Sequence, residues 1–217
     1  MKRKVVKAIA LCSIIGALAI GGTAAYLTDY GEETNTFTVG KVDIELQEPG
    51  WKPEEHDKIV ATEVITKDPK VANVGKNDAY VYMEVAIPMK DVITANEDGT
   101  RNPQAMTEMF SFNKSSNWNL MGTKTVGSDK VYLYNYNKVL TAGQSTEALF
   151  NTVTVANVIE GFVDEQQLDI GVHAYAIQSL NTGDQGSDVN AQAKAAWNKY
   201  ANQNKGQLGD TLSGNVA

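Results

Sequence analysis

The sequence contains little cysteine: Cys12 is the only one in 217 residues, and it lies in an apolar run near the N-terminus. We expect that run to be removed, which leaves the working protein without a thiol. The lack of thiols excludes disulfides, cysteine-based zinc sites and a cysteine nucleophile. The stability of the fold must then come from its core, and the chain is long enough to form one good core.

Histidine is almost as scarce, because the chain holds only His56 and His173. No H-E-x-x-H motif, no G-x-S-x-G nucleophile elbow and no phosphate-binding glycine loop occurs. The sequence therefore predicts no catalytic residues and no cofactor. A metal site built from His56, His173 and carboxylates is the weaker alternative.

Positive charge is also limited, with 19 basic against 26 acidic residues and a formal net charge of −7. Four of the basic residues lie in the first seven positions, so removal of the N-terminal segment lowers the charge to −11. Nucleic acids and anionic membranes are bound by clustered Lys and Arg. The composition thus argues against both as partners.

The N-terminus has the three parts of a secretory signal. Lys2, Arg3, Lys4 and Lys7 precede an apolar run over residues 8–20, and small residues follow at 21–25. We expect cleavage between Ala25 and Tyr26. A permanent membrane anchor is the less favoured reading, because a spanning helix needs about 20 apolar residues. The sequence thus predicts a secreted protein with no stable membrane insertion after cleavage.

Short stretches of alternating apolar and polar residues follow, and this period of two is typical of half-buried strands. The clearest are residues 42–46, 79–87, 118–121, 130–136 and 168–177, with a turn expected at 122–129 and Pro88 expected to end its strand. A short helix is predicted at 103–109. Another is predicted at 188–202, capped by Ser187 or Asp188. The pattern predicts an all-β antiparallel sandwich.

Several blocks of the sequence resemble, in order, the TasA/camelysin family of secreted bacterial proteins, which have SipW-type signal peptides. The blocks are AAYLTD (24–29), NTFTVGKVDI (35–44), EPGW (48–51), ITKDPKVANVG (65–75), DAYV (78–81), LTAGQST (140–146), LF (149–150) and AYAIQ (174–178). The resemblance implies a jelly-roll-like β-sandwich, release by a dedicated signal peptidase, and a location in the extracellular matrix or at the cell surface. The predicted organisation is a signal peptide at 1–25, a flexible mature N-terminus at 26–36, the sandwich at 37–205 and a disordered tail at 206–217.

The same resemblance implies two alternative functions. Members resembling TasA form biofilm-matrix fibres by self-association, together with other matrix proteins, whereas camelysin-like members are described as surface metallopeptidases. In the fibres, the mature N-terminus of one subunit completes the sheet of the next. The donor segment predicted here contains Tyr26, Leu27, Tyr30, Phe37 and Val39. The alternative is that residues 37–46 are the first strand of the chain's own sandwich, behind a floppy terminus.

Overall fold

The structure is a computed structural model, which describes residues 28–30, 42–52, 59–159, 168–183, 186 and 188–203. The predicted signal peptide, its cleavage site Ala25–Tyr26 and the predicted tail at 206–217 lie outside these residues. Among the described helices, none is both long enough and apolar enough to cross a membrane.

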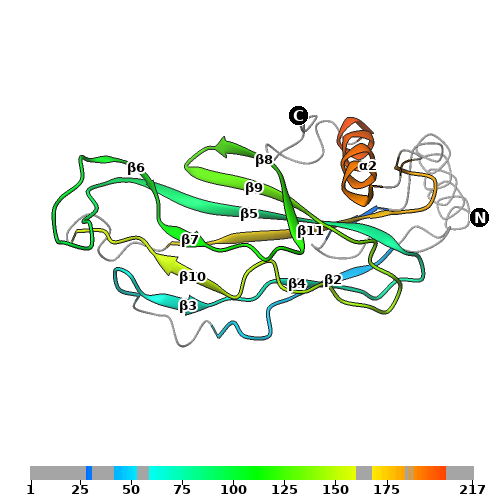
Figure 1. Cartoon of the computed structure of the whole chain (residues 1–217), viewed down its shortest axis with the longest axis horizontal. Helices are drawn as coiled ribbons and strands as arrows, with labels where there is room; N and C mark the ends of the chain where they lie inside the picture. Colours follow the sequence, from blue (N-terminus) through cyan, green and yellow to red (C-terminus); the bar gives the residue numbers. More distant parts are fainter. Residues whose placement is uncertain are drawn as a thin grey trace, which may run out of the picture.

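The largest element is a six-stranded antiparallel sheet built around one long strand, β5 (Figure 1). β5 pairs through eight residues with β11 on one side and through seven with β9 on the other, and its far end pairs with β6. The path of the sheet is β1–β11–β5–β9–β8. The strands are β1 (Thr28–Tyr30), β5 (Ala79–Val92), β6 (Ala105–Glu108), β8 (Trp118–Val126), β9 (Asp129–Tyr136) and β11 (Gly171–Gln178).

Two smaller sheets lie against one face of the large sheet and form the second layer of the sandwich (Figure 1). Strands β3, β10 and β7 make one of them, and β2 and β4 make the other. Their bounds are β2 (Ile44–Gln47), β3 (Val64–Thr66), β4 (Lys70–Asn73), β7 (Phe110–Phe112) and β10 (Thr152–Val155). The predicted fold class, an antiparallel β-sandwich, is confirmed.

The main core lies between these layers, and the alternation predicted for β5 fills it. Val81, Met83, Val85 and Ile87 are completely buried and belong to one apolar cluster with side chains of the second layer. Neighbouring residues of a strand point to opposite faces. Tyr80 and Tyr82 of β5 therefore face a second core.

That second core lies under the helix α2 (Val189–Gln203), on the opposite face of the large sheet (Figure 1). Ala193, Trp197 and Tyr200 of the helix pack on Tyr82 and Tyr175 of the sheet. The amide of Asn190 donates a 3.0 Å hydrogen bond to Asp188 Oδ1, which is the N-cap bond expected from the sequence. The predicted C-terminal helix is confirmed.

Three local predictions are wrong. Residues 105–108 form the strand β6 rather than a helix, because pairing with Met89–Val92 of β5 outweighs a weak helical preference. The turn predicted at 122–129 is much shorter, since β8 continues to Val126. Pro88 does not end β5: it lies beyond Ala86, the last residue paired with β11, so its missing N–H interrupts no bond on that side.

Candidate functional site

Strand β11 is buried on both faces although it lies next to the margin of the large sheet. Ala174 and Ala176 face the main core, while Tyr175 and Ile177 face α2, and all four are buried. Strands buried on both faces normally have strand neighbours on both sides as well. The outer edge of β11 is therefore the first place to look for a functional contact.

Among the residues that the structure describes, three cover that outer edge. β1 pairs antiparallel with β11, with Thr28 opposite Ile177, Asp29 opposite Ala176 and Tyr30 opposite Tyr175. On the β5 side, by contrast, β11 is paired over its whole length, from Gly171 to Gln178. Within the described part of the chain, no strand pairs with residues 171–174 on the side away from β5. An extended peptide can pair with the edge of a sheet.

The opposite margin of the large sheet is protected. β8 carries a bulge between Leu120 and Gly122, where its register with β9 shifts. The following residues Thr123, Lys124 and Thr125 are exposed and polar. Bulges and lysines on an edge strand discourage pairing with another chain. The two margins of the sheet therefore differ, and only the β11 edge has the features of an acceptor.

The predicted donor segment is described only in part. Tyr26, Leu27, Phe37 and Val39 lie outside the described residues, whereas Tyr30 belongs to β1. The sequence suggested either donation to another subunit or a floppy terminus. The structure adds a third arrangement, in which Thr28–Tyr30 pair with β11 of the same chain. Three residues are too few to show a strand period, so no sequence pattern signals this pairing.

The two histidines are not brought together by anything in the described structure. His56 lies outside the described residues. His173 is in β11, directly opposite Glu84 of β5, and Glu84 is buried. No group of three His, Cys, Asp or Glu side chains that could hold a metal ion occurs among the described residues. The donor set found there does not fit a protein metal site, which needs at least three ligands.

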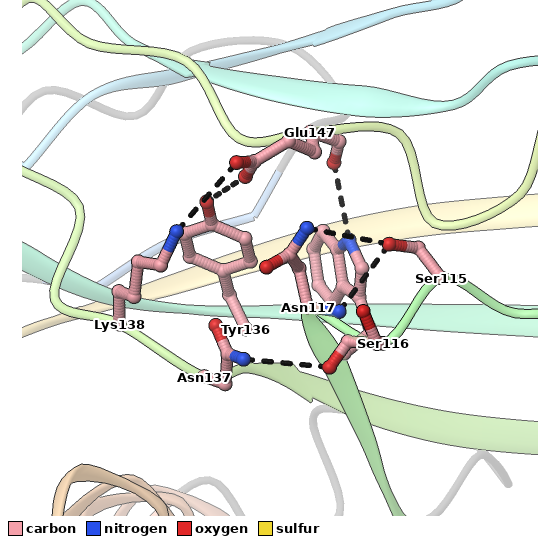
Figure 2. A network of polar contacts seen from close by, with 8 residues as sticks. Ser115, Ser116, Asn117, Tyr136, Asn137, Lys138 and Glu147 are labelled. Atoms are coloured by element: carbon pink, nitrogen blue, oxygen red, sulfur yellow. Dashed lines mark hydrogen bonds and ion pairs between the residues drawn. The ribbon is translucent and has the colours of Figure 1, made fainter.

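A polar network connects the start of β8 and the end of β9 with Glu147 (Figure 2). The hydroxyl of Tyr136 donates to the carboxylate of Glu147, and Lys138 Nζ lies 3.6 Å from the same carboxylate. The indole N–H of buried Trp118 donates to the main-chain oxygen of Glu147 at 3.1 Å. These contacts fasten the segment around Glu147 to the ends of β8 and β9.

The electrostatics of this network favour a structural role. Burial, followed by the hydrogen bond to Glu147, raises the pKa of Tyr136 to about 12. The same hydrogen bond is the largest cause of a lowered pKa at Glu147. At neutral pH the Tyr136 phenol is therefore protonated and the Glu147 carboxylate is charged. In these states the phenol can donate the hydrogen bond and the carboxylate can accept it. Neither group is poised to exchange a proton near pH 7, as a general acid or base would be.

A family model described as camelysin metallo-endopeptidase matches residues 1–207 of the chain. No curated protein matches significantly. No solved structure does so either.

Proposed function

The chain belongs to the camelysin metallo-endopeptidase family, as its resemblance to TasA/camelysin proteins predicted, and on this premise we propose that it is a structural subunit of extracellular fibres. In this proposal the chain is exported, cleaved between Ala25 and Tyr26, and joined to further copies by its N-terminal segment. The observation that carries the proposal is the pairing of the N-terminal strand β1 with the outer edge of β11.

The pairing of β1 with β11 supports this function because donor and acceptor occur in one chain. A segment that pairs with its own β11 has the length and polarity to pair with β11 of another copy. Only three residue pairs hold β1 in place, and each hydrogen bond contributes a net stabilisation of only about 0.5–1.5 kcal/mol. A longer donor that also paired with residues 171–174 would be held by further hydrogen bonds.

The position of β2 gives the donor a path out of its own molecule. β2 begins at Ile44, opposite Asn73, which is the same end of the sandwich at which Thr28 lies opposite Ile177. The chain therefore enters β2 at that end, which is where we propose that the donor leaves its own molecule. Before cleavage, the donor segment is tethered at Ala25. In this proposal, the cleavage that completes export therefore also frees the segment for assembly.

The family description favours a second function, surface peptidase activity, and the fit of the described residues to it is poor. Of the ligands suggested by the sequence, only His173 is described, and no three-ligand group accompanies it. We derive no catalytic step from this arrangement. Metal analysis of the purified protein, with casein hydrolysis by the wild type and by His56→Ala and His173→Ala, tests the peptidase function directly.

Electron microscopy of three proteins tests the fibre proposal: the chain from Tyr26, the chain from Phe37, and a chain from Tyr26 in which residues 26–36 are scrambled. The scrambled chain keeps length and composition, so it controls for charge and solubility. We expect fibres from the first protein only. A synthetic peptide of residues 26–39 should slow growth of those fibres by competing for β11. Equal fibre formation by the chain from Phe37 would rule out the N-terminal donor.

A further inference from the structure

The sequence contains one Asp-Gly dipeptide, Asp98–Gly99, and no Asn-Gly dipeptide. In such dipeptides the main-chain nitrogen of glycine can attack the side-chain carbon of the residue before it, because glycine has no Cβ to obstruct the approach. The Gly99 nitrogen would form a bond to Asp98 Cγ, and its proton and the carboxyl hydroxyl would leave as water. Asp98–Gly99 is therefore the place in this chain where the rearrangement is chemically easiest.

The product of that attack is a five-membered succinimide ring. Water opens the ring at either of its two carbonyl groups. One opening restores aspartate, and the other yields isoaspartate, in which the main chain runs through Cβ and Cγ of residue 98. The whole reaction releases one water molecule and takes up one, so it needs no other reactant and leaves the mass of the chain unchanged.

Asp98 and Gly99 lie at the tip of the loop between β5 and β6, at one end of the long axis of the sandwich (Figure 1). The amide of Asn96 donates to the Thr100 carbonyl at 2.8 Å, and the amide of Gly99 donates to the Asn96 carbonyl at 3.0 Å. Gly99 has φ of 82°, in the left-handed region that glycine adopts without strain. Residues 96–100 are all exposed, so water reaches the dipeptide freely.

Thr100 holds the side chain of Asp98 through two hydrogen bonds. Its main-chain amide donates to Asp98 Oδ1 at 2.9 Å, and its hydroxyl donates to the same oxygen at 2.6 Å. Asn96 Nδ2 donates to Thr100 Oγ1 at 2.9 Å, so the hydroxyl accepts one bond and uses its single proton for Asp98. The carboxylate is thus fixed by two donors from one residue.

These bonds oppose ring closure in two ways. Ring closure needs the protonated carboxyl, because a carboxylate repels the attacking nitrogen and has no hydroxyl to lose. The side-chain hydrogen bond from Thr100, followed by its main-chain hydrogen bond, lowers the pKa of Asp98 and so reduces the protonated fraction. Ring closure also needs Asp98 Cγ to turn toward the Gly99 nitrogen, whose N–H is already bonded to Asn96.

We propose that Asp98–Gly99 is a site of spontaneous isoaspartate formation and that Thr100 is the positioning residue that restrains it. This inference goes beyond the proposed fibre function and does not depend on it. Isoaspartate adds one carbon atom to the main chain of the loop. The longer loop would disturb the bond between Asn96 and Thr100 and the bridge between Ala95 and Arg101 at its base. Thr100 therefore protects the hairpin from slow chemical damage.

Two substitutions at Thr100 test its role in the chain from Tyr26. Thr100→Val removes the hydroxyl, keeps nearly the same shape and leaves the main-chain amide in place, whereas Thr100→Ser keeps the hydroxyl. During incubation at mildly acidic pH, we expect Thr100→Val to form isoaspartate at residue 98 severalfold faster than the wild type, and Thr100→Ser to match the wild type. Peptide mapping by liquid chromatography and mass spectrometry measures the product, which elutes separately at unchanged mass. Circular dichroism with thermal unfolding confirms that each variant is folded.

Synthetic peptides of residues 94–102, with Thr or Val at position 100, separate the effect of the fold from that of the local sequence. Both peptides lack the folded hairpin, so they should form isoaspartate at equal rates and faster than the wild-type chain. Equal rates in the wild-type and Thr100→Val chains would refute the role of Thr100. The same rate difference in the peptides as in the chains would refute it as well. Isoaspartate that accumulated first at another aspartate would show that Asp98–Gly99 is not the site.

Discussion

The hydroxyl of Tyr82 donates a 2.6 Å hydrogen bond to the main-chain carbonyl oxygen of Ala193. Tyr82 is completely buried near the start of β5, and the centre of its ring lies 4.9 Å from that of Trp197. Burial raises the pKa of this hydroxyl well above its usual value, so it stays protonated. The bond therefore ties α2 to the large sheet at a point that water does not reach.

The Tyr82→Phe substitution should lower the free energy of unfolding by about 1–2 kcal/mol, because a buried hydrogen bond is lost without a change in shape. Urea unfolding followed by circular dichroism measures this. Tyr80→Phe is the matched control. Its hydroxyl bonds at 2.8 Å to the Gln192 side chain, which can turn toward solvent, so its effect should be smaller. Equal stability of Tyr82→Phe and wild type would mean that this bond does not hold the helix.

A second prediction concerns Gly50, whose amide donates a 2.7 Å hydrogen bond to Asp68 Oδ1. A Cβ atom at this position would lie 2.9 Å from Asp68 Oδ1 and 2.9 Å from Thr66 Cγ2. We expect Gly50→Ala to destabilise the fold by about 1–3 kcal/mol, because the crowded atoms must move. At Gly186 an added Cβ would meet no atom within 4 Å, so Gly186→Ala should leave the thermal midpoint nearly unchanged. Equal thermal midpoints for Gly50→Ala and Gly186→Ala would contradict this prediction.

A third prediction concerns the ion pair of Lys67 and Glu48, which is 2.9 Å long and largely buried. Lys67 Nζ also lies 4.8 Å from the centre of the Trp51 ring. Lys67→Met should destabilise the protein by about 3–5 kcal/mol, because it leaves the Glu48 charge buried and unpaired.

The double variant Lys67→Met/Glu48→Leu supplies the control for this pair. It removes both charges, so it should recover most of the stability that Lys67→Met loses. A double-mutant cycle from denaturant unfolding yields the coupling energy. Strictly additive losses would show that the two side chains do not interact.

The fourth prediction is a fall in stability at alkaline pH. The pKa of Tyr136 is about 12 in the folded chain, against an ordinary value of 10. A group whose pKa is raised by folding stabilises the native state fully below the ordinary pKa, and that stabilisation is lost as pH rises toward the folded value. The free energy of unfolding should therefore decrease between about pH 10 and 12.

Tyr136→Phe isolates this effect from the other tyrosines. Its stability should fall less steeply than that of the wild type over the same interval, when both are measured by denaturant unfolding at several pH values. Identical slopes would contradict the assignment. At acid pH, Glu147 has the opposite effect. Because folding lowers its pKa, Glu147 stabilises the fold at pH values above its ordinary pKa of 4.5. This stabilisation is lost as the pH falls through the pKa of Glu147 in the folded chain.

The sequence predicted those helices and strands in which apolar residues recur at a regular spacing. Val81, Met83, Val85 and Ile87 recur at every second position, and they fill the main core as expected. Ala193, Trp197 and Tyr200 have helical spacing, and they form one face of α2. In both cases the pattern and the burial have the same cause, because one side of each element packs on a core.

The elements that depend on distant partners were not predictable in this way. β6 is a strand because it lies beside residues 89–92, and β1 is a strand because it lies beside Tyr175–Ile177. Neither segment carries a strand pattern of its own. The position of β11 near the margin of the sheet was not predicted for the same reason. Which strand lies at a margin depends on the order of the strands, and no local sequence pattern indicates that order.

The central strand has a mechanical consequence. β5 runs along the long axis of the sandwich, and it is paired on both sides by antiparallel neighbours. The hydrogen bonds of such pairs lie perpendicular to the strands. Tension applied between Gln178 at the end of β11 and Val92 at the far end of β5 therefore shears all the bonds of β11 with β5 at once, instead of opening them one after another. A chain of such molecules would resist stretching along its length far better than it resists peeling from the side.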